Sequence, residues 1–147
     1  MLKEVFKMID TKIYKAVYSL AEKLMAAANK DDRKAFDKHY AELKALCIEH
    51  ENTKKDHPEQ WETLAEFEEE IEDALLGYQK ALGKAVAINS NDHMSSIGYS
   101  MATLYVELGQ TDDAIKCLQE AKSSAVKIED KDLRAEIDQL LKDLSAR

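Results

Sequence analysis

An internal repeat of 40 residues is the feature that most constrains how this chain can fold. The clearest copies are AVAINSND at 85–92 and AVKIEDKD at 125–132. A repeat of this length indicates a small supersecondary unit that buries its apolar face by stacking on its neighbours. The residues that recur at this interval are Leu24, Leu64, Leu104 and Leu144; Ala41, Ala81 and Ala121; Ala45, Ala85 and Ala125; and Ile48, Ile88 and Ile128.

The third copy has the apolar spacing of two α-helices, at about 92–108 and 112–129. Apolar residues recur there at three- and four-residue steps, which gives each helix one buried face. Gly109 is expected to end the first helix in the left-handed conformation, and Thr111 or Asp112 to cap the second. The connection is so short that the two helices must form an antiparallel hairpin.

Shifting this hairpin by 40 residues predicts the rest of the chain. One hairpin is expected from helices at 11–28 and 31–50, and another from helices at 58–68 and 71–90. A final helix at 131–145 is expected to cover the end of the stack, as terminal repeats commonly do. Its apolar residues are Leu133, Ile137, Leu140, Leu141 and Leu144.

Two boundaries stay open at this level. Residues 1–9 form either a separate short helix or the start of one helix that runs to 28. The stretch EFEEEIED at 66–73 has no glycine, so the helices at 58–68 and 71–90 could merge into one long helix and remove the second hairpin.

Composition agrees with an all-α fold. Hydrophobic residues make up 45% and charged residues 34%, with one proline and four glycines. This balance favours helices with short connections over disorder. A chain of 147 residues is expected to form a single domain, 1–147, with hairpins at 11–50, 58–90 and 92–129 and the capping helix at 131–145.

Charge and hydropathy restrict the partners. The chain has 21 basic and 29 acidic residues, a net charge of −8, which repels nucleic acid and anionic lipid. No segment approaches the roughly 20 apolar residues of a membrane span. The N-terminal stretch MLKEVFKMIDTKIYK lacks the apolar core of a secretory signal. A cytoplasmic protein that binds neither nucleic acid nor membrane is expected.

Residues that could carry catalysis or a metal do not form a complete set. Cys47 and Cys117 are far apart and outside any CxxC pair, so free thiols in a reducing compartment are expected. Cys47, His50 and His57 could share a metal, but a structural zinc site needs a fourth ligand.

The carboxylates at 66–73 are interpreted as a solvated turn. Di-metal carboxylate sites use Glu-x-x-His, and no histidine here has an acidic residue three positions before it. Phosphate-binding glycine loops and nucleophile elbows are also missing from the sequence. No cofactor, no metal and no enzymatic activity are expected.

Residues 95–121 resemble a tetratricopeptide repeat. Seven of the eight positions that define this repeat are suitably filled, and Gly98 stands where the family has an aromatic residue. Small residues are needed at several of these positions because the two helices cross closely. The matching residues are Met101, Ala102, Tyr105, Gly109, Ala114, Leu118 and Ala121.

The resemblance weakens toward the N-terminus. The second copy keeps Ala74, Tyr78 and Ala81, and the first keeps the spacing of Tyr18, Ala21, Leu24 and Met25. The period of 40 exceeds the family's usual ~34, and the usual proline after the second helix is missing. HEAT-like hairpins are the alternative, although their characteristic proline is missing as well. The resemblance implies six or seven helices in a short right-handed superhelix.

The resemblance also implies a groove lined by the first helix of each hairpin, which would hold a partner peptide or helix. Lys and Asn, which form the carboxylate clamp of some family members, are replaced here by Tyr99 and Thr103, so such a clamp is not expected. The positions that would line the groove are Ser96, Tyr99, Thr103, Val106 and Glu107; Asp56, Glu59, Thr63, Glu66 and Phe67; and Ala16, Ser19, Lys23, Ala26 and Ala27.

With Tyr99 and Phe67 as anchors and Glu66 and Glu107 at the rim, this groove would suit an apolar peptide with some positive charge. The expected function is a non-enzymatic protein-interaction module or adaptor. One alternative is a structural homodimer that associates through the apolar end helix. Another is a small metal-dependent enzyme.

Overall fold

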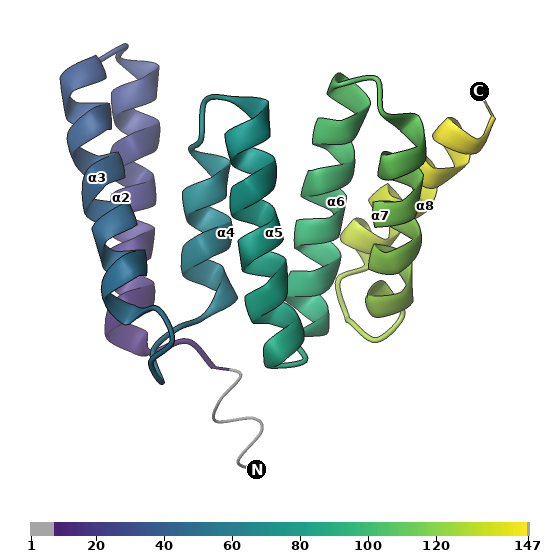
Figure 1. The fold of residues 1–147 in the computed structure, drawn as a ribbon, viewed down its shortest axis with the longest axis horizontal. Coiled ribbons are helices and arrows are strands. Elements are labelled where there is room, and N and C mark those ends of the chain that lie inside the picture. Colours follow the sequence, from purple (N-terminus) through teal and green to yellow (C-terminus); the bar gives the residue numbers. More distant parts are fainter. Residues whose placement is uncertain (1–7, 147) are drawn as a thin grey trace. The chain divides into compact units, whose positions relative to one another are not determined.

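The structure, a computed structural model, describes residues 8–146 as seven α-helices joined by short turns, with no strand in that range (Figure 1). The expected all-α hairpin fold is confirmed. None of the helices in this range is both long and apolar enough to cross a membrane. The helices are α2 (Thr11–Asn29), α3 (Arg33–His50), α4 (Pro58–Glu66), α5 (Ile71–Ala87), α6 (Asn91–Glu107), α7 (Thr111–Ala125) and α8 (Lys131–Ser145).

The chain forms two compact units that divide within α5, after Lys84. The first unit contains α2, α3, α4 and most of α5, and the second contains the end of α5 with α6, α7 and α8. The expectation of one domain over 1–147 stays a prediction. The alternatives for residues 1–9 concern mainly positions outside the described residues, but α2 begins at Thr11 with Asp10 as its cap, so no helix runs through Asp10.

Short polar side chains fix most of the helix starts. The Asp10 carboxylate accepts hydrogen bonds from the amides of Lys12 and Ile13, at 3.0 and 3.2 Å. Asp32, Ser90 and Asp130 act in the same way at α3, α6 and α8. α7 begins at Thr111, as expected, but the expected capping by Thr111 or Asp112 is wrong, because the N-cap is Gln110 and makes no side-chain capping bond.

Three helix ends use a residue in the left-handed conformation. Gly109 ends α6 in this way, with φ of 74°, as expected, and Asp31 and Asn89 do the same after α2 and α5 with φ of 54° and 53°. Each lets the next amide reach back to a carbonyl five residues earlier, the Schellman arrangement. These bonds join Asp32 N to Ala27 O, Ser90 N to Ala85 O, and Gln110 N to Tyr105 O, each at 2.9 Å.

In the first unit, α2 lies against α3, and α4 lies against both. Leu24, Leu43 and Cys47 are fully buried in this unit. The alternative of one merged helix over 58–90 is wrong, because α4 ends at Glu66 and α5 begins at Ile71. The two come close at Gly77, where an added Cβ would lie 3.0 Å from the Cβ of Ala65.

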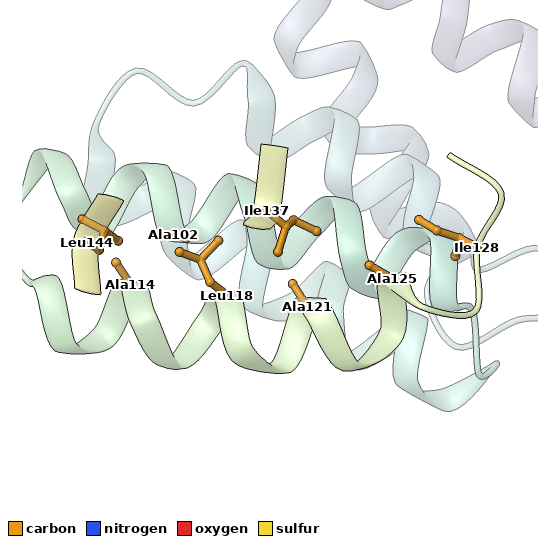
Figure 2. Packing of buried hydrophobic residues seen from close by; sticks show 8 residues of the cluster. All are labelled: Ala102, Ala114, Leu118, Ala121, Ala125, Ile128, Ile137 and Leu144. Atoms are coloured by element: carbon orange, nitrogen blue, oxygen red, sulfur yellow. The ribbon is translucent and has the colours of Figure 1, made fainter. Parts of the chain in front are cut away.

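In the second unit, α6 packs on α7, and α8 covers both. Figure 2 shows the shared core, in which α7 contributes mostly alanines and α8 contributes Ile137 and Leu144. The bounds of the expected capping helix, 131–145, are confirmed. By contrast, α7 ends at Ala125 and not at the expected 129. The expected end was too late because Ile128 continues the apolar spacing, but it is buried from the turn that follows the helix. The bounds expected at 68 and 90 overshoot in the same way, by two and three residues.

Candidate functional site

The groove positions expected in the first unit differ in accessibility. Ser19 and Lys23 are exposed on α2, and Glu66 is exposed over part of its surface at the end of α4. Thr63 is 8% exposed, and Ala27 is 5% exposed. Those two side chains therefore offer little surface to a partner.

The groove positions expected in the second unit are mostly half-buried. Tyr99 and Val106 pack against the core of that unit, and the Thr103 hydroxyl donates to the carbonyl of Ser100 at 2.7 Å. Burial, together with Glu136 on α8, raises the pKa of Tyr99. Ser96 is half-buried as well, and Glu107 is exposed. Much of the apolar surface expected to hold a partner is thus used inside the unit.

A cleft of about 370 Å³ lies in the first unit between the start of α3 and the turn that joins α4 to α5. It combines three aromatic rings with five carboxylates and one guanidinium, and we call it the aromatic–acidic cleft. Its lining residues are Arg33, Phe36, Asp37, Tyr40, Phe67, Glu68, Glu69, Glu70 and Asp73.

Two phenylalanines join the walls of this cleft. The rings of Phe36 on α3 and Phe67 after α4 meet edge to face, with centroids 6.4 Å apart. The guanidinium carbon of Arg33 lies 5.0 Å from the Phe36 centroid, in a cation–π arrangement. These contacts hold the α4–α5 turn against α3.

Arg33 is bound on both sides by carboxylates. Its two terminal nitrogens donate to the two oxygens of Glu69 at 2.7 and 2.6 Å, and its Nε donates to Asp37 at 3.0 Å. These bonds raise the pKa of Arg33 and lower the pKa values of Glu69 and Asp37. Because all three side chains are exposed, the bonds order the turn more than they stabilise the fold.

Three further carboxylates line the cleft. The Tyr40 hydroxyl donates to the carboxylate of Glu68, and burial together with this bond raises the pKa of Tyr40. Among the described residues, neither Glu70 nor Asp73 pairs with a basic side chain. The cleft therefore carries uncompensated negative charge.

A second cleft, of about 420 Å³, continues from the first. The two share Tyr40, Glu68 and Asp73. We call the second the tryptophan cleft, and its remaining lining includes Leu76, whose side chain is 65% exposed. The other lining residues are Lys44, Trp61, Leu64, Ala65, Gly77 and Lys80.

A polar network fixes Trp61 in the wall of the tryptophan cleft. The indole nitrogen donates to Asp56 at 2.8 Å, and the Lys80 ammonium lies 4.2 Å from the ring centroid. The Lys84 ammonium lies 2.7 Å from Asp56. Burial alone would raise the pKa of Asp56, but its bonds with Lys84, the Asn52 amide and Trp61 hold it below the usual value. Asp56, expected in the groove, is thus part of a structural network.

The cysteines are poor nucleophiles. Cys47 is fully buried and donates to the carbonyl of Gln60 at 3.4 Å, and burial raises its pKa to about 12. Burial also raises the pKa of the half-buried Cys117. His57, a candidate metal ligand with Cys47, caps α4 by accepting a hydrogen bond from the Glu59 amide at 3.1 Å through Nδ1.

Among the expected groove positions, Glu66 has the largest pKa shift. Burial of its carboxyl group, together with repulsion from Glu62 and Glu59 on the same helix, raises its pKa to about 7. The side chain is therefore partly protonated near neutral pH.

The sequence reasoning missed both clefts because their walls come from segments about 30 residues apart. A signal that points to the first cleft is the spacing of Arg33, Phe36 and Tyr40, which places all three on one face of α3. The carboxylates at 66–73 are largely exposed, as expected for a solvated turn, but Glu68 and Glu69 bind α3.

Comparison with protein-family models, curated proteins and solved structures found no match to this chain. The likeness to tetratricopeptide repeats therefore stays a prediction that rests on residues 95–121.

Proposed function

We propose that this chain is a non-enzymatic protein-interaction module, built from tetratricopeptide-like hairpins, that binds a segment of a partner protein. The observation that carries this proposal is the pair of continuous clefts in the first unit, with aromatic walls and a charged rim. Stacked helix hairpins commonly use such surfaces to hold peptides.

The proposed site lies on different helices from the groove expected from the sequence. That groove would follow the first helix of each hairpin, whereas the clefts lie mainly along α3 and α5, the second helices, with α4 and its turn. Leu76 supports this location, because a large apolar side chain 65% exposed in a cleft gains contact area when a partner binds.

The two thiols favour binding over catalysis, since neither cysteine has the lowered pKa of a reactive nucleophile. Two free cysteines also suit the reducing cytoplasm, where we place the protein in this proposal.

A site-specific photo-crosslinker at Leu76 tests the proposal in cells. Val126 provides the matched control, because the two side chains are 65% and 64% exposed and Val126 lies outside both clefts. We expect one or a few proteins to be crosslinked from position 76 and not from 126. The purified partner should then bind Leu76→Ser more weakly than the wild type. The same adducts from both positions, or none from 76, would refute the proposal.

Self-association is the second candidate, and one observation favours it. Tyr14, Tyr18 and Met25 on α2 are 45%, 58% and 56% exposed, and the two tyrosine rings stack with centroids 6.4 Å apart. The apolar face of α8, expected from the sequence to form a dimer, is instead used inside its unit, where Ile137 is 0% and Leu144 is 2% exposed. Sedimentation that shows dimers in the wild type and monomers in Tyr18→Ser would support association through α2.

A further inference from the structure

The geometry points to an arginine side chain of the partner segment as the group that the aromatic–acidic cleft binds. This inference rests on the proposed function and gives the partner's chemistry at that cleft. The bound segment would place its arginine between Phe36, Tyr40 and Phe67 and the carboxylates of Glu70 and Asp73.

Charge is the first argument. Five carboxylates and one guanidinium line the cleft, which leaves four negative charges in excess. Arg33 engages Glu69 and Asp37, whereas Glu70 and Asp73 have no basic partner among residues 8–146. A cationic ligand would therefore meet carboxylates that give up no existing ion pair, and an anionic ligand would be repelled.

The mode in which the chain binds its own Arg33 is the second argument. That guanidinium lies over the Phe36 ring and is bound in bidentate fashion by Glu69. Planar guanidinium groups favour this combination of an aromatic face and a carboxylate fork. The remaining aromatic surface and the two unpaired carboxylates offer the same chemistry for a second guanidinium.

A divalent cation fits the cleft less well than an organic cation. A third carboxylate ligand, beyond Glu70 and Asp73, would have to come from Asp37, Glu68 or Glu69. Each of these is already bound to Arg33 or Tyr40. The phenylalanine walls also offer apolar contact to the methylene stem of an arginine and no ligand to a metal.

The adjoining tryptophan cleft indicates that the partner segment also carries an apolar residue near its arginine. Leu76, Leu64 and Ala65 supply apolar surface there, and Tyr40 belongs to both clefts. A partner segment with an arginine and a nearby leucine-sized residue therefore matches the combined surface.

The test is an NMR titration of the full ¹⁵N-labelled chain. The probe is an acetylated, amidated heptapeptide with one arginine and one leucine in a glycine–serine background. We expect saturable shifts of backbone amides in 33–40 and 67–73. Replacing arginine by citrulline, which has nearly the same shape but no charge, should weaken binding about five-fold, the effect of one or two exposed ion pairs.

Variants of the chain locate the binding. Glu70→Gln combined with Asp73→Asn should raise the Kd of the arginine peptide about five-fold. Glu72→Gln removes an exposed carboxylate in the first helical turn of α5 that lies outside both clefts, and it should leave the Kd unchanged. Circular dichroism of each variant verifies that the fold is retained.

Three results would overturn the inference. They are equal binding of the citrulline peptide, no saturable shift in the cleft at millimolar peptide, and the same saturable shifts produced by calcium chloride alone. A partner that crosslinks at Leu76 and binds the double variant as tightly as the wild type would refute the arginine site and leave the proposed function standing.

Discussion

At Gly98 the missing side chain lets α6 meet α7. A Cβ built on Gly98 would lie 2.9 Å from the Cβ of Ala121 and 3.4 Å from the carbonyl oxygen of Cys117. Neither neighbour is the end of a flexible side chain, so an added methyl group must push the helices apart. This contact gives a physical reason for a glycine at position 98.

Gly98→Ala is therefore expected to destabilise the fold by about 1 kcal/mol or more, since the overpacking exceeds the gain in helix propensity. Gly83→Ala is the matched control. It also lies within a helix, and its added Cβ would have no neighbour within 4 Å, so we expect it to stabilise by about 0.5–1 kcal/mol. Urea denaturation followed by circular dichroism measures both, and equal effects of the two substitutions would contradict this account.

Helix ends show how the same turn is made by different residues. Asp31, Asn89 and Gly109 all have positive φ, although only the glycine adopts this conformation without steric cost. The glycine was predicted from the sequence because glycine is the usual residue there. Asp31 and Asn89 were not, since both residue types are also common in ordinary turns and helix caps.

Substitutions at Asn89 and Gly109 should change the free energy of unfolding in opposite directions. We expect Asn89→Gly to stabilise by about 0.5 kcal/mol, because the strain of the left-handed residue is removed, and Gly109→Ala to destabilise by about 1–2 kcal/mol. Thermal unfolding of the two single variants provides the measurement. A loss of stability in Asn89→Gly would mean that its side chain contributes more than the strain costs.

Apolar periodicity was enough to predict the hairpins but not every boundary. It located α2, α6 and α8 to within one residue at each end, because short turns and side-chain caps coincide there with the end of the apolar stripe. It placed the start of α3 two residues early, at 31 and not at Arg33. It overshot the end of α7, where Ile128 stays buried outside the helix. Burial and helical conformation are separate properties, and the sequence pattern reports mainly the first.

The break between α4 and α5 depends on contacts distant in sequence. Residues 67–70 include no glycine or proline, but Phe67 packs on Phe36, and Glu69 and Glu68 bind Arg33 and Tyr40. These bonds span 28 to 36 residues, so local propensity could not decide between a turn and a merged helix. The aromatic–acidic cleft escaped prediction for the same reason, because this turn forms one of its walls.

For the molecule as a whole, Glu66 introduces a dependence of stability on pH. Its pKa is about 7 in the folded state and 4.5 ordinarily. Between these values the folded chain keeps a proton that the unfolded chain loses, so the free energy of unfolding falls as pH rises from about 4.5 to about 7. Asp56 acts in the opposite sense below pH 4, since its lowered pKa makes its contribution disappear in acid.

Glu66→Gln should therefore be about 1 kcal/mol more stable than the wild type at pH 8 and similar to it at pH 4. The magnitude is kept well below the full pKa shift because part of the side chain is in solvent, which screens the repulsion. Urea denaturation at several pH values tests this, with Glu72→Gln as the control. If the stability of Glu66→Gln falls between pH 5 and 7 as much as that of the wild type, the pH dependence belongs to another group.

The position of Trp61 also gives this protein a built-in optical probe. It is the one tryptophan in the sequence, it lines the second cleft, and a lysine ammonium lies 4.2 Å from its ring. Indole fluorescence responds strongly to nearby charge and water. Selective excitation of tryptophan therefore reads a single point in the first unit. A ligand that displaces Lys80 will change the colour and intensity of the emission without any attached dye, and unfolding of α6, α7 and α8 will contribute no tryptophan signal of its own.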